Sequence, residues 1–374
     1  MTEITAQERR LRVTAGFDGY VDTIARAVKE KAADGTEVFF ETIEEFGKHI
    51  VSKAGKSALM ELHTQDKRMG GCMALYSRAL LALDVEVTAV GALGLPKTHP
   101  VFDDIVNHEN SRIYSVGQPG YTEAVEFHDG KIMFGHNEEI AQLDAKQLAE
   151  ELAKQGTSTK ELFSHADMIA LFNWSELTHA TGIWKSIAGE LNAPVLVDLA
   201  DLSMRTDEEI KEMFALLSLI SRKVPVTLSV NKNELEQLCR GLGLPEGMHP
   251  VEAAGVLFER LSGSRIVVHL TGGAFCVCRA GLFSRRNVHF DKPLISTGGG
   301  DNFNAGLTLG LLSDWHINDC LALANAVSGF YVSHGYSPSQ QEVLELSRPV
   351  SMIWKCWKSE QIQVSCCVKG SRNL

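Results

Sequence analysis

The sequence predicts an α/β fold built on a mostly parallel sheet, and two observations carry this prediction. From about residue 140 onward, short apolar segments alternate with longer amphipathic ones. This alternation is typical of a parallel sheet that helices cover on both faces. In addition, polar and glycine-rich turns follow several of these strands, at the sheet edge where α/β folds bind their ligands. A length of 374 residues allows one large domain with a small appendage, or two domains.

The first part of the chain is expected to contain few regular elements. Arg12–Ala15 reads as a short strand that leads into the turn Gly16–Asp22. Residues 24–62 are charged and weakly patterned, with Glu37–Glu41 as the best strand candidate. After them Gly70-Gly71 should open a helix, because an apolar run follows directly.

In the next segments, the pattern of apolar and polar residues is clear enough to predict helices and strands. We expect a helix over Cys72–Leu83, then strands over Val85–Val90, Thr122–Phe127 and Lys131–Phe134. Asp129-Gly130 lies between the last two runs, and Asp-Gly between alternating segments is a strong hairpin signal.

The remaining elements follow a helix–strand repeat. The predicted strands are Met168–Phe172, Val195–Asp198, Thr227–Val230, Ile266–Leu270 and Phe275–Arg279. The predicted helices between them are Ser175–Leu191, Asp207–Ile220, Glu234–Arg240 and Pro250–Leu261. Asp22, Asn231, Thr271 and Asp301 all lie just beyond predicted strands, so they are the candidate site residues.

Composition and charge exclude several classes of protein. A formal charge of −11 without a dense basic segment argues against nucleic-acid binding, because neutralising phosphates requires clustered Lys and Arg. The N-terminus lacks the apolar core of a signal peptide, and no run approaches the length of a membrane span. None of the eight cysteines forms a CxxC pair, so a zinc site is not indicated. We therefore expect a cytoplasmic protein with no membrane partner.

The most specific chemical signal is a glycine triplet. Gly298, Gly299 and Gly300 precede Asp301 and the apolar helical run Phe303–Leu312. Consecutive glycines at a helix N-terminus allow backbone N–H groups to approach an anion, and the adjacent carboxylate is a potential base. The run lacks the Lys-Ser/Thr of a P-loop and the third glycine of GxGxxG. The alternative interpretation is a tight turn with Asp301 as an N-cap.

This run resembles the C-terminal signature of the PfkB/ribokinase family of carbohydrate kinases, D-T-x-G-A-G-D-x-F-x-A-G. The matching residues are Thr297, Gly298, Gly300, Asp301, Phe303, Ala305 and Gly306, with Gly299 as a small-residue variant. The resemblance implies a ribokinase-like three-layer α/β/α fold with a small β-sheet lid. It also implies that the amides of Gly298–Gly300 form an anion hole, while Asp301 takes the proton of a sugar hydroxyl during phosphoryl transfer.

Three further segments match the donor side of the family. Asn231 and Glu234 resemble its N-x-x-E motif, which organises Mg²⁺ through water near the phosphates of ATP. Thr271 and Gly273 lie in a turn that resembles the T-x-G turn at the nucleotide phosphates, and Asn325 falls where the family lines its adenine pocket. A capped helix start and a helix core are the alternative interpretations of the first and last segments.

The substrate side resembles the family at two places. Gly70 and Gly71 correspond to its Gly-Gly pair, which approaches the sugar closely. Asp18 and Asp22 lie in the opening turn whose aspartate binds sugar hydroxyls, with Asp22 the better match. The alternative for these two residues is that both are ordinary turn-forming aspartates.

The resemblance covers about residues 11–345 and suggests a domain division. The kinase core is predicted to comprise 11–23, 51–118 and 137–349, and the lid 24–50 and 119–136. The lid would exclude water during phosphoryl transfer, and its strand edges make a homodimer plausible. Residues 350–374 form a C-terminal tail whose apolar residues follow neither a helical nor a strand period, and they are assigned no role.

Two departures from the family pattern keep alternatives open. Ile295 stands where the signature usually has Asp, which leaves dependence on a monovalent cation open, and Leu75 replaces the usual sugar-binding Asn. The turn Gly16–Asp22 also resembles the related ADP-dependent sugar kinases. The alternatives to an ATP-dependent sugar kinase are thus a nucleoside kinase, an ADP-dependent sugar kinase, or a sugar-binding regulator without catalysis.

Overall fold

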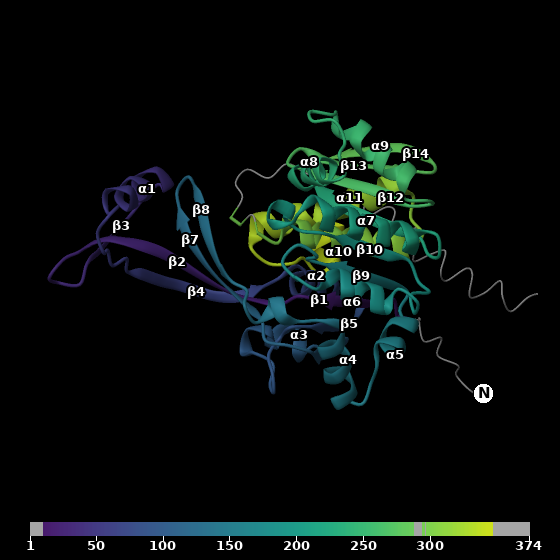
Figure 1. Cartoon of the computed structure of the whole chain (residues 1–374), viewed down its shortest axis with the longest axis horizontal. Helices are drawn as coiled ribbons and strands as arrows, with labels where there is room; N and C mark the ends of the chain where they lie inside the picture. The colour runs from purple at the N-terminus through teal and green to yellow at the C-terminus, as the bar shows by residue number, and fades with distance from the viewer. Residues whose placement is uncertain (1–9, 288–293, 296, 347–374) are drawn as a thin grey trace, which may run out of the picture.

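The structure is a computed structural model, and it describes residues 10–287, 294–295 and 297–346. In this part of the chain, a nine-stranded sheet carries helices on both faces, and a five-stranded sheet extends from one side (Figure 1). The predicted tail 350–374 lies outside the described residues.

The large sheet is mostly parallel, as predicted. Its order is β14-β13-β12-β11-β10-β9-β1-β5-β6, and the pairs from β12 to β6 are parallel. The strands are β1 (Arg12–Phe17), β5 (Glu86–Gly91), β6 (Ser111–Ser115), β9 (Met168–Phe172), β10 (Val195–Asp198), β11 (Val226–Asn231), β12 (Arg265–Leu270), β13 (Gly273–Cys278) and β14 (Gly281–Arg286). The antiparallel strands β13 and β14 close one edge.

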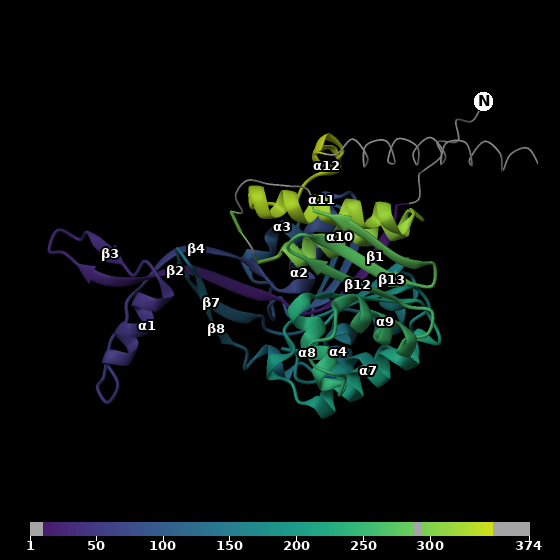
Figure 2. The same cartoon turned by 90° about the horizontal axis from the view of Figure 1, so that it is seen from above.

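Helices form one layer on each face of this sheet (Figure 2). One layer contains α2 (Cys72–Ala82), α3 (Asp103–Val106), α10 (Gly299–Leu312), α11 (Ile317–His334) and α12 (Gln340–Leu346). The other contains α4 (Ala145–Lys154), α5 (Thr159–Ser164), α6 (Ala180–Ile187), α7 (Asp207–Ser221), α8 (Lys232–Gly241) and α9 (Pro250–Arg260). Each face has its own apolar core, since Ile169 and Leu171 belong to one cluster while Met168, Ala170 and Phe172 belong to the other. This is the three-layer arrangement that the sequence predicted.

The smaller sheet is the small β-sheet that the predicted fold class includes, and it is called the lid below. Its order is β3-β2-β7-β8, and β4 pairs with β2. The elements are β2 (Tyr20–Lys31), β3 (Glu37–Phe39), α1 (Ile43–Ser52), β4 (Leu62–Gly70), β7 (Gly120–Phe127) and β8 (Gly130–His136). A small apolar cluster that includes Phe40, Phe46 and Phe127 holds α1 against the sheet. The predicted hairpin around Asp129-Gly130 is confirmed by the antiparallel pairing of β7 with β8.

The lid takes a larger share of the chain than the sequence suggested. The strand β4 lies inside 51–118, which was assigned to the core, and β2 begins at Tyr20, before residue 24. The physical reason is that β2 continues directly from the opening turn and pairs with β4 on one side and β7 on the other. Most of β4 is exposed and polar, so it lacks the apolar alternation by which strands are recognised.

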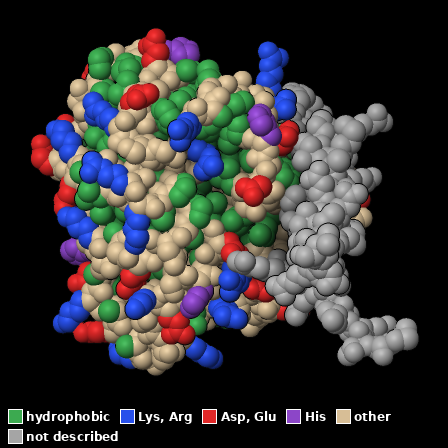
Figure 3. All heavy atoms as spheres, turned by 90° about the vertical axis from the view of Figure 1, so that its right-hand side faces the viewer, with side chains coloured by type: hydrophobic (Ala, Val, Ile, Leu, Met, Phe, Trp, Pro, Cys, Tyr) green, Lys and Arg blue, Asp and Glu red, His purple; other side chains and the backbone are tan. Residues whose placement is uncertain are grey.

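Neither a membrane-spanning helix nor a basic patch (Figure 3) is seen in the described part of the chain that these observations cover. None of the helices in the described residues is both long and apolar enough to cross a bilayer. On the face away from the smaller sheet, acidic and basic side chains are interspersed (Figure 3). No continuous basic patch is seen on the part of that face formed by described residues.

Candidate active site

The N-termini of two helices from opposite ends of the sequence meet beside the sheet. α2 begins after its N-cap Gly71, and α10 begins after its N-cap Gly298. The two helices pack together, and the buried hydroxyls of Tyr76 and Thr308 lie 2.8 Å apart. This packing places the start of α2 beside Asp301, in the first turn of α10.

The glycines of the triplet have different reasons to be glycine. Gly298 has a left-handed φ of 90°, and a Cβ there would lie 2.7 Å from the Tyr331 hydroxyl oxygen. A Cβ on Gly299 would lie 3.2 Å from a methyl group of Val332. For Gly300, the nearest described atom would be Cε1 of His269 at 3.4 Å, an ordinary contact. Internal packing therefore does not require glycine at position 300, which leaves room for a ligand above its backbone.

Asp301 is a buried carboxyl group in an acidic surrounding. Burial raises its pKa well above the ordinary carboxyl value, and the nearby Asp198 and Asp18 raise it further. A hydrogen bond from the Cys72 thiol opposes this shift. Asp301 is thus held as a strong proton acceptor once ionised, because its neighbours disfavour the negative charge.

Asp198 was not identified from the sequence, although it ends a correctly predicted strand. Its carboxylate accepts hydrogen bonds from the Asn304 side chain at 2.7 Å and from the Ala200 amide at 3.0 Å. The signal that could have found it is its position at the carboxyl end of β10, the same criterion that selected Asn231.

Asn231 and Glu234 form a complete capping box at the start of α8. The Asn231 side chain accepts from the Glu234 amide at 2.9 Å, and the Glu234 carboxylate accepts from the Asn231 amide at 2.8 Å. The alternative interpretation as a helix start is therefore correct as local structure. Burial, with Asp198 nearby, also raises the pKa of Glu234 to about 8.

This environment fits a hydrated cation better than a directly coordinated one. Within the described residues, no group of three or more His, Cys, Asp or Glu side chains is arranged to hold a metal ion. Yet Asp198 raises the pKa of both Glu234 and Asp301, and Glu234 raises that of Asp301, so a divalent cation near them would relieve this repulsion. Mg²⁺ commonly keeps several waters, which suits residues that are already hydrogen-bonded.

The other residues predicted on the donor side lie near the β12–β14 edge. Thr271 is exposed in the turn after β12. Gly273 is required by packing, since a Cβ there would lie 2.3 Å from the Arg285 carbonyl oxygen. The buried Asn325 side chain donates to the carbonyls of Arg285 and Arg286 at 3.2 Å, so it braces β14.

On the substrate side, the structure brings Asp22 and Gly70 together. A Cβ on Gly70 would lie 2.4 Å from the Asp22 carboxylate, so glycine is needed for this carboxylate to sit where it does. Burial raises the pKa of Asp22, while a hydrogen bond with Thr122 and the charges of Lys131 and Arg68 lower it. Asp22 lies on β2, at the junction of lid and core.

Asp18 has a different environment. Its carboxylate oxygens accept from the amides of Cys72 and Met73, both at 2.7 Å, and from the Asn173 side chain at 3.0 Å. The group is fully buried, and burial raises its pKa to about 6 against these hydrogen bonds. Asp18 therefore fixes the N-terminus of α2, and its oxygens are used within the protein. A Cβ on Gly71 would lie 3.1 Å from one of them, and its φ is 92°.

A lid lysine reaches the glycine triplet. Lys131, on β8, hydrogen-bonds the hydroxyl of Thr297, directly before Gly298, and lies near Asp22. Lys131 could not be identified from the sequence as a site residue, because this contact spans 166 positions of the chain. The lid thus supplies a positive charge beside the candidate site.

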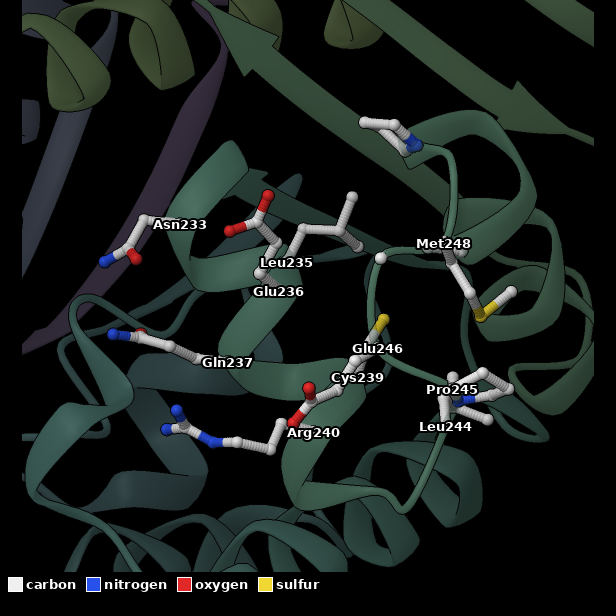
Figure 4. A pocket seen from close by; sticks show the side chains of 13 residues that line it. Asn233, Leu235, Glu236, Gln237, Cys239, Arg240, Leu244, Pro245, Glu246 and Met248 are labelled. Carbon is white, nitrogen blue, oxygen red and sulfur yellow. The ribbon is translucent and has the colours of Figure 1, made fainter.

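A separate cavity of about 380 Å³ lies between α8 and the start of α9 (Figure 4). Leu235, Cys239, Leu244 and Met248 contribute apolar side chains to it. None of the site residues predicted from the sequence lines this cavity, so it is not the site described above.

Comparisons with known proteins agree with the resemblance seen in the sequence. A family model described as prokaryotic ketohexokinase matches residues 1–348. A ketohexokinase of Haloferax volcanii is 29% identical over 341 residues, which is 89% of each protein.

Solved structures share the fold at low identity. A ribokinase of Thermotoga maritima superimposes with a TM-score of 0.63 and 16% identity, covering 90% of this chain and 99% of that one. An Arabidopsis thaliana ribokinase complexed with ribose and ATP gives a TM-score of 0.61 and 16% identity, covering 90% and 98%. At these identities the likeness establishes the fold alone.

Proposed function

Since the chain belongs to the prokaryotic ketohexokinase family, and is thus a carbohydrate kinase of the PfkB/ribokinase type, we propose that it phosphorylates a hydroxyl of a ketohexose with ATP as donor. The observation that carries the proposal is the juxtaposition of Asp301 with the open backbone of Gly300 at the α10 N-terminus. It combines a proton acceptor with an anion site within one helical turn.

The transfer step follows from these groups. As the sugar hydroxyl oxygen bonds to the γ-phosphorus, Asp301 takes its proton, and the bond between that phosphorus and the β–γ bridging oxygen breaks to release ADP. The amides at Gly298–Gly300 and the N-terminal end of α10 stabilise the negative charge on the transferred group. Such transition states need charge stabilisation and an oriented nucleophile more than covalent assistance.

Residues on β11 and α8 complete the donor side. Asn231 and Glu234 would hold Mg²⁺ through water, and the ion supplies neutralisation of phosphate charge when bound. We place the phosphates along the turn of Thr271 and Gly273, and the adenine near Asn325. The Arabidopsis ribokinase complexed with ribose and ATP, which shares the fold, supports ATP as the donor.

On the acceptor side, we assign sugar binding to Asp22 and to the backbone at Gly70 and Gly71. The Asp22 carboxylate is held over Gly70 and is buried at the lid junction, which suits recognition of sugar hydroxyls. Asp18 is given a supporting role, since its oxygens hold α2. The contact of Lys131 with Thr297 supports a lid that covers the site and excludes water from the transferred group.

A coupled kinase assay tests the proposal. Ketohexoses such as fructose, aldohexoses, ribose and nucleosides are offered with either ATP or ADP. Fastest turnover of a ketohexose with ATP supports the proposal, whereas preference for a nucleoside or for ADP selects one of the alternatives from the sequence. Thermal stabilisation by sugar alone, with no turnover and no effect of nucleotide, would identify a sugar-binding regulator instead. Repeating the assay with and without K⁺ tests the consequence of Ile295.

A dimer through the lid is the quaternary state we propose. β8 lies at one edge of the smaller sheet, and its Met133 and Phe134 are about half exposed. An open strand edge with apolar side chains can pair with a second copy. Sedimentation analysis of the wild type and of Met133→Glu tests this: a wild-type dimer that the substitution dissociates supports it, and a monomeric wild type contradicts it.

A further inference from the structure

His269 has no role in the transfer step described above. It lies at the carboxyl end of β12, where it pairs in register with Asn231 of the neighbouring strand β11. Register partners in parallel strands point toward the same face of the sheet. The imidazole is also the nearest described group to the space above Gly300. His269 therefore stands between the residue assigned to the cation and the glycine assigned to the anion hole.

Its Nε2 atom is buried and has no hydrogen-bond partner among the described residues. Burial lowers the pKa of His269 to about 4, so the ring is neutral at physiological pH and carries one N–H donor. Buried polar atoms without partners are uncommon and costly, and a ligand that arrives from solution is one explanation for such an atom.

Two neighbours define the space around this atom. The Phe303 ring lies 5.1 Å from the imidazole, centroid to centroid, at 35°, and this packing limits how the imidazole can turn. On the other side, Gly300 leaves its Cβ position empty, with Cε1 and Nε2 of His269 3.4 and 3.8 Å from that point. The unpaired nitrogen and the missing Cβ therefore border the same small space, and they are independent observations.

We propose that His269 donates a hydrogen bond from Nε2 to a non-bridging oxygen of the terminal phosphates of the nucleotide. The inference rests on the proposed function, because it requires a nucleotide donor at the α10 N-terminus. It assigns a further binding residue to the donor site, on a strand whose sequence is otherwise mostly apolar. A neutral donor suits this place, since the cation held near Asn231 and a second positive charge would repel each other.

Three variants separate the hydrogen bond from the packing. His269→Phe keeps an aromatic ring against Phe303 and removes both nitrogens. His269→Gln places an amide nitrogen near the position of Nε2, whereas His269→Asn places one near Nδ1. Binding of AMP, ADP and a non-hydrolysable ATP analogue is measured for each by calorimetry with Mg²⁺ present, together with thermal unfolding and steady-state kinetics.

The loss of affinity should depend on how many phosphates the nucleotide carries. His269→Phe should weaken binding of the ATP analogue by about 10- to 100-fold, which is the effect of one hydrogen bond to a charged group. Its affinity for AMP should stay within about 2-fold of the wild-type value. His269→Gln should recover most of the lost affinity, and His269→Asn should not. KM for the sugar should stay unchanged in all three.

The outcomes distinguish this inference from the proposed function. If the wild type binds none of the nucleotides, the proposed function fails and the inference falls with it. If the wild type binds the ATP analogue and His269→Phe binds it equally well, the inference alone is overturned. It is also overturned if His269→Phe weakens AMP binding as much as binding of the ATP analogue. The same holds if the Gln and Asn variants bind the ATP analogue equally well, because either result indicates a packing role. Should His269→Phe fail to fold, the affinities of His269→Gln and His269→Asn for the ATP analogue are compared: tighter binding by the Gln variant supports the inference, and equal binding overturns it.

Discussion

Alanine substitutions at Gly298 and Gly300 should separate the fold from the chemistry of the glycine triplet. At Gly298, alanine would have to adopt a φ of 90° and approach the Tyr331 hydroxyl to 2.7 Å. The left-handed backbone costs about 1–2 kcal/mol for a residue with a Cβ. The close contact adds about 1–3 kcal/mol of overpacking. We therefore expect Gly298→Ala to lose about 2–5 kcal/mol of unfolding free energy.

Gly300→Ala should behave in the opposite way. Its Cβ meets described atoms no closer than 3.4 Å, and alanine is favoured over glycine in a helix by about 0.5–1 kcal/mol. The free energy of unfolding should therefore stay unchanged or rise slightly. The methyl group fills the space left for the transferred phosphoryl group, so kcat should fall by at least about 100-fold, comparable to the loss of one oxyanion donor.

Thermal unfolding and the coupled kinase assay measure both effects. An unfolding entropy of about 2.1 cal/mol/K per residue means that each kcal/mol moves Tm by about 1.3 °C in a chain of this length. Gly298→Ala should then lower Tm by about 3–6 °C, while Gly300→Ala stays within about 1 °C of the wild type. Normal turnover by Gly300→Ala would refute the argument that this glycine serves a ligand. A drop in Tm as large as that of Gly298→Ala would refute it too.

Three further substitutions test the site. Asp301→Asn should lower kcat about 10²- to 10⁴-fold with KM for MgATP nearly unchanged, because only the proton acceptor is lost; near-normal turnover on the best substrate contradicts this. The rate should fall as pH drops through the raised pKa of Asp301, and Asp198→Asn should move that acidic limb to lower pH, since a neighbouring negative charge is removed; a limb that stays in place or moves upward counts against it. Lys131→Met should raise KM for the sugar and lower kcat without changing Tm, and unchanged kinetics would show that its contact with Thr297 serves no catalytic purpose.

Local patterns were sufficient for most of the large sheet and for part of the candidate site, although the edge strands β6 and β14 were not predicted. The strands β9–β12 are short, apolar and buried, so their periodicity reveals them, and the chain order of parallel strands brings their carboxyl ends together. Asn231 was selected as a candidate in this way. Asp198 satisfies the same criterion at the end of β10 and was overlooked, because no motif drew attention to it.

Contacts between distant segments could not be predicted. Asp18 and Asp22 lie four positions apart in one turn, and the sequence proposes both as substrate ligands, yet the Asp18 carboxylate is occupied by amides 54 and 55 positions away. The lid strand β4 also escaped notice, because its exposed polar face carries no apolar alternation. Its strand character comes from pairing with β2, which only the folded chain supplies.

The meeting of α2 with α10 has a consequence for how the protein reaches its working state. Tyr76 and Thr308, whose buried hydroxyls join these helices, are 232 positions apart in the chain. Closing so long a loop is entropically unfavourable and slow, so contacts of this kind tend to form after local ones. During synthesis, α2 leaves the ribosome long before its partner exists. Recovery of enzymatic turnover after dilution from denaturant should therefore lag behind the recovery of helical circular dichroism.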